Sequence, residues 1–319
     1  MTLLLRPLLH QTISVFTFMA VMAAVFALPA FAGAAENDSK PGLLILTHGA
    51  PSPKWAASIK TFAEKTAALN ETKKTFHAVT AANMEFAKPD AADGIKLLEE
   101  AGCDRIVVVP AFICPTSHTH FDVPASLGLY TSPSIRKTMA EENIKPAKPK
   151  VPVIVTQTIS EGDLLDKFVR DEIAALSETP ADEAVLLIAH GDEQHAGLVE
   201  PVMRRLLVEA VGSKGITLGD WAFCEVGQSY RQNVVPVIQE MAKNRKRVLV
   251  VGFYLVSSAK SITNAGLKTG ARPAGYGTGA NTDAPKDPFE GIDVRFSEKG
   301  VIDHPYAPQW VLQTASDAL

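Results

Sequence analysis

The sequence contains few cysteines and almost no excess charge of either sign. Three cysteines stand among 319 residues, and 31 Lys and Arg against 35 Asp and Glu leave a formal net charge of −4 at pH 7. A chain so close to neutral lacks the basic surface that nucleic acids require, and no basic amphipathic stretch indicates a membrane-surface binder. We therefore expect a small molecule or an ion as the partner, and no nucleic acid.

The odd number of thiols argues against a framework in which every cysteine is paired. Cys103 and Cys224 stand beside apolar stretches, which is typical of small buried hydrophobic side chains. Cys114 stands in a more polar segment near two histidines. It is either another such side chain or a soft neighbour of a metal ion.

The first 32 residues have the pattern of a secretory signal peptide. Arg6 supplies a positive charge, an almost uncharged apolar run covers 13–28, and Ala30-Phe31-Ala32 is a small-x-small cleavage signal. We predict cleavage before Gly33, a periplasmic location, and no stable membrane insertion afterwards. The alternative is an uncleaved membrane anchor, because the apolar stretch 13–32 is just long enough to span a bilayer.

Strand patterns alternate with helix patterns along the rest of the chain, and 46% of the residues of the full sequence are hydrophobic and 21% charged. We predict strands at 43–48, 76–82, 105–110, 151–156, 185–190, 218–223, 247–252 and 291–295. We predict helices at 54–69, 89–101, 161–177, 197–212, 231–244 and 306–318. This order is typical of the α/β class, in which parallel sheets are covered by helices on both faces.

An apolar run followed by His-Gly occurs twice, at 43–49 and at 185–191. Later landmarks keep nearly equal spacing in both halves, which indicates duplication. We predict two similar doubly wound parallel-sheet domains, 41–180 and 181–319, with a cleft between them. His48 and His190 then stand at the carboxyl ends of strands, where open α/β sheets bind ligands.

Two segments fall outside the regular alternation. The segment 137–150 is charged and contains prolines, so we expect an exposed connection. The segment 269–287 is rich in glycine, proline, alanine and asparagine, so we expect a long loop. That loop is either a lid over a ligand or a solvent-exposed insertion.

The loop that follows strand 105–110 carries His118 and His120. At the end of a strand these side chains can converge with His48 across the top of the sheet. Imidazole is a suitable ligand for Co²⁺, Ni²⁺, Fe²⁺ or Zn²⁺, and the carboxylate of Glu85 would balance charge or accept protons. The alternative is that His118 and His120 are ordinary loop residues and that His48 caps the next helix.

A His-Gly pair also begins acid-phosphatase motifs. Those motifs need an arginine beside the histidine, as in Arg-His-Gly, to hold the phosphate. Thr47 and Ala189 precede the two histidines of this chain. Phosphate chemistry is therefore disfavoured.

The motifs of the first half resemble those of the CbiX-type sirohydrochlorin chelatases, which are class II chelatases. His48-Gly49-Ala50-x-x-Pro53-x-Trp55 resembles the family's His-Gly-Ser-x-x-Pro-x-Trp. Met84-Glu85-Phe86-Ala87-Lys88-Pro89 resembles Glu-x-x-x-Pro. Gly102, Val108-Val109-Pro110-Ala111-Phe112 and His118-x-x-x-Asp122-Val123-Pro124 resemble Gly, Val-Val-Pro-x-Phe and His-x-x-x-Asp-Ile-Pro.

The resemblance implies a lyase that inserts a divalent metal, Co²⁺ or else Ni²⁺ or Fe²⁺, into a tetrapyrrole such as sirohydrochlorin in cobalamin biosynthesis. It implies no organic cofactor, because the metal ion is a substrate. His48 and His118 would be the metal-binding catalytic pair, with Glu85 as the assisting carboxylate. His120 has no counterpart in the pattern and would be a further metal ligand or a proton carrier.

The predicted export of the chain leaves a second function open, because sirohydrochlorin and cobalamin chemistry is expected in the cytoplasm. An exported family member can meet another tetrapyrrole. It can also be a periplasmic carrier that binds a metal, haem or another tetrapyrrole without turnover.

The second half departs from the pattern of the first. It keeps His190 and Glu225, but an alignment of Pro110 with Gly252 sets Lys260 opposite His118. A protonated lysine is a poor metal ligand. We therefore expect one catalytic half and one degenerate, supporting half.

The supporting half would contact the carboxylates of the tetrapyrrole. Ser257, Ser258 and Lys260 are candidates, because hydroxyls and cations bind carboxylates. His190 is either part of this substrate-binding set or a relic of the duplication.

Overall fold

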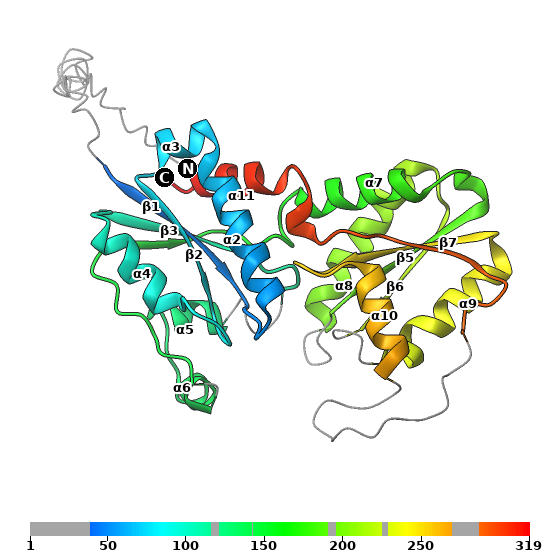
Figure 1. The fold of residues 1–319 in the computed structure, drawn as a ribbon, viewed down its shortest axis with the longest axis horizontal. Coiled ribbons are helices and arrows are strands. Elements are labelled where there is room, and N and C mark those ends of the chain that lie inside the picture. The colour runs from blue at the N-terminus through cyan, green and yellow to red at the C-terminus, as the bar shows by residue number, and fades with distance from the viewer. Residues whose placement is uncertain (1–38, 116–120, 142, 191–195, 225–228, 270–286) are drawn as a thin grey trace, which may run out of the picture. The chain divides into compact units, whose positions relative to one another are not determined.

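Two parallel four-stranded sheets form the framework of the chain (Figure 1). The computed structural model describes residues 39–115, 121–141, 143–190, 196–224, 229–269 and 287–319. The predicted signal peptide at 1–32, His118, His120 and Glu225 lie outside these residues, as does most of the loop at 269–287. Among the described helices, none has both the length and the apolar character needed to cross a bilayer.

The first sheet has the strand order β2-β1-β3-β4, with all neighbouring strands parallel. Its strands are β1 (Pro41–Thr47), β2 (Ala78–Asn83), β3 (Arg105–Pro110) and β4 (Val153–Val155). The helices of this half are α2 (Pro53–Ala68), α3 (Asn70–Thr75), α4 (Ala91–Glu100), α5 (Val123–Ser126), α6 (Pro133–Glu141) and α7 (Leu164–Leu176). Every residue of β1 is buried, as expected for a central strand covered on both faces.

The second sheet has the same order, β6-β5-β7-β8, and is also parallel. Its strands are β5 (Glu183–Ala189), β6 (Leu218–Phe223), β7 (Arg247–Phe253) and β8 (Asp293–Phe296). The helical elements are η2 (Pro180–Asp182), α8 (Ala196–Leu206), η4 (Leu207–Val211), η5 (Gly212–Lys214), η6 (Tyr230–Val234), α9 (Val235–Asn244), α10 (Ala259–Thr269), η7 (Val301–Asp303) and α11 (Ala307–Ser316). The prediction of two similar α/β sheets is therefore confirmed.

The strand register supports the internal alignment made from the sequence. Leu46 of β1 pairs with Pro110 of β3, and Ile188 of β5 pairs with Gly252 of β7. Pro110 and Gly252 thus occupy equivalent positions in the two sheets. His48 and His190 follow β1 and β5 directly, each at the carboxyl edge of its sheet.

Side chains alternate between the two faces of each sheet, so each sheet contributes to two layers of core. One face of the first sheet packs with α4, and one face of the second packs with α9 and α10. The remaining faces of both sheets belong to one continuous cluster that also includes α2, α7, α8 and α11. A shared apolar core therefore joins the two halves.

Two helices cross between the halves. α7 follows the first sheet in sequence but contacts β7, α8 and η4 of the second half. α11 ends the second half but contacts α2, α3 and β3 of the first. The predicted domain limits at 180 and 181 separate the strands of the two sheets but not these helices, and the limits stay a prediction.

Each predicted helix matches an observed one. The observed helices α3, α5, α6 and α10 were not predicted. The segment 137–150, expected to be an exposed connection, begins inside α6, which buries only Ile135 and Met139. That apolar stripe is too narrow to give a clear helical period. α10 is rich in Ser, Thr, Asn and Gly, which are weak helix formers, so the packing of Ala259 and Ile262 stabilises it.

Glu183 at the start of β5 is a buried carboxylate with 1% of its side chain exposed. The N–H groups of Glu178 and Thr179 donate to it at 2.8 and 3.0 Å, and Ser177 Oγ also donates. Arg247 Nη1 lies 3.1 Å from Glu183 Oε1. Burial opposes ionisation of Glu183, but these donors outweigh it and hold the pKa of Glu183 below its ordinary value.

We expect Glu183→Ala to lower the free energy of unfolding by about 3 kcal/mol at neutral pH, because it leaves buried donors and Arg247 without their acceptor. A lowered carboxyl pKa stabilises the fold above the pKa of the unfolded chain, and this stability is lost as the pH falls through the folded pKa. Urea unfolding of both proteins from pH 7 down to pH 3 checks both effects, since the variant should lose part of the acid dependence.

Glu178→Ala is the matched control, because Glu178 also pairs with Arg247, at 3.0 Å, but its side chain is 60% exposed. An exposed ion pair contributes little to stability, because solvent screens it. Equal losses of stability in the two variants would contradict the role given to Glu183.

Candidate functional site

His48 and Glu85 meet at the carboxyl edge of the first sheet. The pairing of β1 with β2 continues past the strands, since Met84 N–H donates to the Thr47 carbonyl at 2.7 Å and Glu85 N–H donates to the His48 carbonyl at 3.0 Å. This pairing places His48 Nε2 2.8 Å from Glu85 Oε1. The structure therefore brings together two of the residues singled out in the sequence.

The two side chains differ in access to solvent. The Glu85 side chain is 5% exposed, and that of His48 is 35% exposed. A ligand that arrives from solvent thus meets the imidazole, and the carboxylate lies behind it.

The hydrogen bonds of the His48 ring define its chemistry. Nδ1 lies 3.0 Å from the Gly49 carbonyl oxygen, which only accepts, so Nδ1 carries a proton. The contact of 2.8 Å between Nε2 and Glu85 Oε1 then requires one more proton, which the two atoms share. A metal cation can take the place of that proton, because imidazole and carboxylate are both ligands for divalent ions.

Gly49 is required by this geometry. Its φ is +99°, which disfavours any residue with a side chain, and a Cβ at this position would lie 1.9 Å from the Glu85 carbonyl oxygen. The glycine lets the turn after β1 pass close to the turn after β2. The His-Gly pair is therefore needed to bring Glu85 to His48.

Asn83, at the end of β2, holds three segments around the pair. Its Oδ1 accepts from Thr47 Oγ1 at 2.9 Å and from Trp55 Nε1 of α2 at 3.4 Å. Its backbone N–H donates to the Pro89 carbonyl at 2.8 Å. Sequence reasoning missed Asn83, although a polar residue at the end of an apolar strand was a usable signal.

Two aromatic rings flank His48. The Phe112 ring lies 6.4 Å from the imidazole, edge-on at 68°, and Phe112 is buried. The Phe86 ring lies 5.6 Å away at a tilt of 37°, and Phe86 is 62% exposed. One ring belongs to the core and the other lines the open side of the site.

His118 and His120, the other predicted metal ligands of the first half, lie outside the described residues. Within the described ranges, no group of three or more His, Cys, Asp or Glu side chains is arranged to hold a metal ion. The pairing of His48 with His118 stays a prediction. Cys114 is half-buried against the core, whereas Cys103 and Cys224 are buried as predicted.

The equivalent edge of the second sheet differs. His190 is exposed at the end of β5. Tyr254, which has the register position of Phe112, donates from its hydroxyl to the Cys224 carbonyl at 2.7 Å, and burial raises the pKa of Tyr254. The Tyr230 hydroxyl lies 2.7 Å from Thr263 Oγ1 in the core. These phenols are structural groups in the apolar interior.

The predicted substrate-binding residues of the second half lie at the start of α10. Lys260 stands in the first turn of this helix, and its exposed amine pairs with Glu298. Ser258 Oγ accepts from the Ser261 N–H at 3.1 Å, as an N-cap does. Ser257 is half-buried beside it. Their contact with a substrate stays a prediction.

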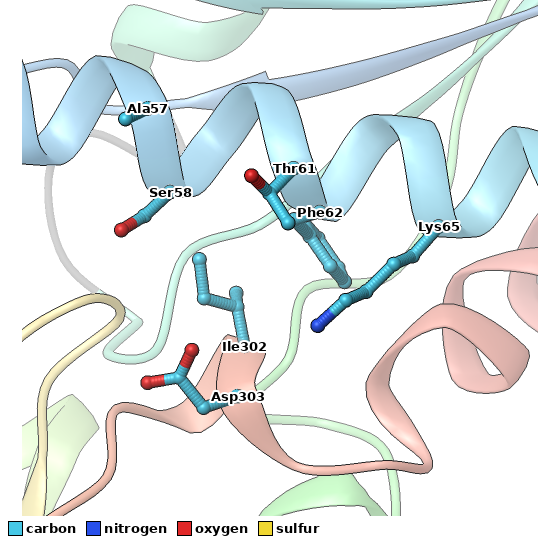
Figure 2. Close-up of a pocket in the computed structure, with 7 residues that line it drawn as sticks. All are labelled: Ala57, Ser58, Thr61, Phe62, Lys65, Ile302 and Asp303. Carbon is cyan, nitrogen blue, oxygen red and sulfur yellow. The ribbon is translucent and has the colours of Figure 1, made fainter.

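A cavity of about 190 Å³ lies between α2 and η7 (Figure 2). Its lining residues are Ala57, Ser58, Thr61, Phe62, Lys65, Ile302 and Asp303. Neither His48 nor Glu85 lines it. Ligand sites usually have about 300 to 1,000 Å³, so this cavity is too small for a tetrapyrrole.

The CbiX family model matches residues 42–176, the part of the chain that contains the first sheet, His48 and Glu85. A sirohydrochlorin cobaltochelatase of Methanococcus maripaludis is 33% identical over 88 residues, which are 28% of this chain and 58% of the relative. A chloroplastic sirohydrochlorin ferrochelatase of Arabidopsis thaliana is 30% identical over 84 residues, or 26% of this chain and 36% of the relative. The matched region thus spans less than two thirds of either relative.

A solved structure extends the likeness to both halves. The structure of SirB from Bacillus subtilis with Fe³⁺ has a TM-score of 0.60, covers 88% of this chain and 95% of its own, and is 14% identical. At this identity the likeness concerns the fold alone. The second half therefore shares the architecture of that protein, whereas the sequence match lies in the first.

Proposed function

We propose that the protein is a class II chelatase that inserts a divalent metal ion into a tetrapyrrole such as sirohydrochlorin, because the CbiX family model matches residues 42–176. The observation that carries this proposal is the contact of 2.8 Å between His48 Nε2 and Glu85 Oε1 at the carboxyl edge of the first sheet. A half-exposed imidazole backed by a buried carboxylate is suited to accept a cation from solvent.

The metal ion enters as a substrate. It takes the place of the proton shared by Nε2 and Oε1, and the negative charge of Glu85 lowers the net charge of the bound ion. Proton and metal compete for the same atoms, so metal binding releases a proton. The family motif implies His118 as a second imidazole ligand.

Transfer of the metal requires an acceptor for two protons, because the free tetrapyrrole loses two pyrrole N–H protons as its nitrogens bind the ion. When the metal leaves His48 and Glu85, Nε2 and Oε1 become available to accept protons. The groups that release the cation are thus the groups that can accept those protons. No covalent intermediate and no organic cofactor are needed.

The choice of metal is the finer part of the proposal. Imidazole and carboxylate accept Co²⁺, Ni²⁺ and Fe²⁺ alike, and supply often decides which ion is used. The relatives include a cobaltochelatase and a ferrochelatase, which supports Co²⁺ or Fe²⁺. We propose Co²⁺ as the first ion to test.

We expect purified protein to convert sirohydrochlorin faster than a protein-free control when Co²⁺, Ni²⁺ or Fe²⁺ is supplied without oxygen. The change in the macrocycle's absorbance measures the rate. Rates equal to the control for all three ions would contradict the proposal. Stoichiometric uptake of metal or haem without turnover would instead favour the carrier function, which the predicted export of the chain suggests.

A further inference from the structure

Phe86 combines two unfavourable features at the site. It is one of the large apolar residues left on the surface, with 62% of it exposed. Its φ is +62°, a left-handed value that is uncommon for a bulky side chain. Neither feature adds to the stability of the fold, so the arrangement points to a functional reason.

The backbone around Phe86 is held in this conformation by its neighbours. Ala87 N–H donates to the Glu85 carbonyl at 2.8 Å, which closes a γ-turn with Phe86 at its centre. A positive φ at the central residue is typical of the rare, strained form of this turn. The Glu85 carbonyl also lies against Gly49. Beyond the γ-turn, the Asn83 N–H donates to the Pro89 carbonyl and so holds the segment that follows Ala87.

The turn directs the Phe86 ring to the open side of His48. The two ring centroids are 5.6 Å apart with a tilt of 37°. Glu85, the residue before Phe86, is buried. The strained residue thus presents an apolar aromatic face beside the imidazole that is proposed to hold the metal.

We propose that Phe86 is the positioning residue for the tetrapyrrole. Its ring stacks on the flat conjugated macrocycle and holds the pyrrole nitrogens over the ion at His48. Aromatic faces stack well on flat conjugated ligands, and the exposed area of Phe86 is covered only when the ligand is present. This inference rests on the function proposed above.

The test is Phe86→Gly with Phe86→Tyr as the conservative variant. Glycine removes the ring and adopts a positive φ without strain, so the melting temperature should stay equal or rise. The dissociation constant of metal-free sirohydrochlorin, followed by absorbance titration, and its KM should each rise about ten-fold. The kcat should fall as well, because the pyrrole nitrogens are no longer held over the ion. The affinity for Co²⁺ alone should change less than about two-fold, and Phe86→Tyr should behave as wild type.

Leu97→Ala is the control, because Leu97 is also an exposed apolar residue, at 48%, and belongs to α4 rather than to the turn that carries Phe86. Unchanged macrocycle binding in Phe86→Gly would overturn the proposal. A lower melting temperature together with weaker Co²⁺ binding would also overturn it, since that result indicates a structural role. If wild-type protein binds no tetrapyrrole, the proposed function itself fails, and the two failures are thereby distinguished.

Discussion

Replacing His48 by alanine is expected to lower kcat/KM for metal insertion roughly 10²- to 10⁴-fold, the range typical of a lost proton-transfer group. The substitution removes Nε2, which lies 2.8 Å from Glu85 Oε1 and is the exposed ligand of the pair. Initial rates at varied metal and tetrapyrrole concentrations measure the loss. Metal binding without tetrapyrrole should weaken in parallel, because Glu85 is too buried to take up an ion alone.

His77→Ala is the matched control for His48→Ala. His77 is exposed near the start of β2, and its Nε2 lies 3.0 Å from the Ala101 carbonyl oxygen, away from the carboxyl edge of the sheet. Its replacement should leave the rate unchanged. Turnover within ten-fold of wild type in a folded His48→Ala protein would refute the assignment of His48.

Replacing Gly49 by alanine is expected to lower the free energy of unfolding by more than about 2 kcal/mol and to abolish most of the activity. An added Cβ would lie 1.9 Å from the Glu85 carbonyl oxygen, so the turn after β2 must move. That movement separates Glu85 from His48. Urea unfolding and the insertion assay measure the two effects.

Gly102→Ala isolates the part of the effect that comes from backbone strain. Gly102 has φ +86°, close to that of Gly49, but nothing lies within 4 Å of its added Cβ. We expect Gly102→Ala to lower the free energy of unfolding by only about 1 to 2 kcal/mol, because alanine is strained in the left-handed conformation. The variant should keep its activity. Equal losses of stability and activity in Gly49→Ala and Gly102→Ala would mean that the contact of the added Cβ with the Glu85 carbonyl does not cause the effect at Gly49.

Much of the framework was predictable because it follows from local patterns. Apolar runs such as 43–48 and 185–190 predicted β1 and β5, since a strand buried on both faces must be apolar throughout. The helix expected at 89–101 is present as α4, and the structure shows a capping box of Asp90 and Asp93 at its start. The approach of His48 to Glu85 followed from the topology, because neighbouring parallel strands end at the same edge.

Side-chain geometry inside the loops was not predictable in this way. The positive φ of Phe86 and the bonds of Asn83 to Thr47 and Trp55 depend on segments that are distant in sequence. No hydrophobic period or residue spacing in one amino-acid sequence indicates such contacts between distant segments. The exposed face of Phe86 emerged only once β1 and β2 were paired.

The sequence by itself determined the order of the strands, the helices α2, α4, α7, α8, α9 and α11, the duplication, and the position of one histidine at the end of each first strand. These properties follow from hydrophobic period and from residues that begin or end an element, which act within a few positions. Only the tertiary structure decided that α7 packs on the second sheet and α11 on the first, and that Gly49 lets His48 reach Glu85. The reason is that both halves present similar apolar surfaces, so the choice between them lies in packing across the whole chain.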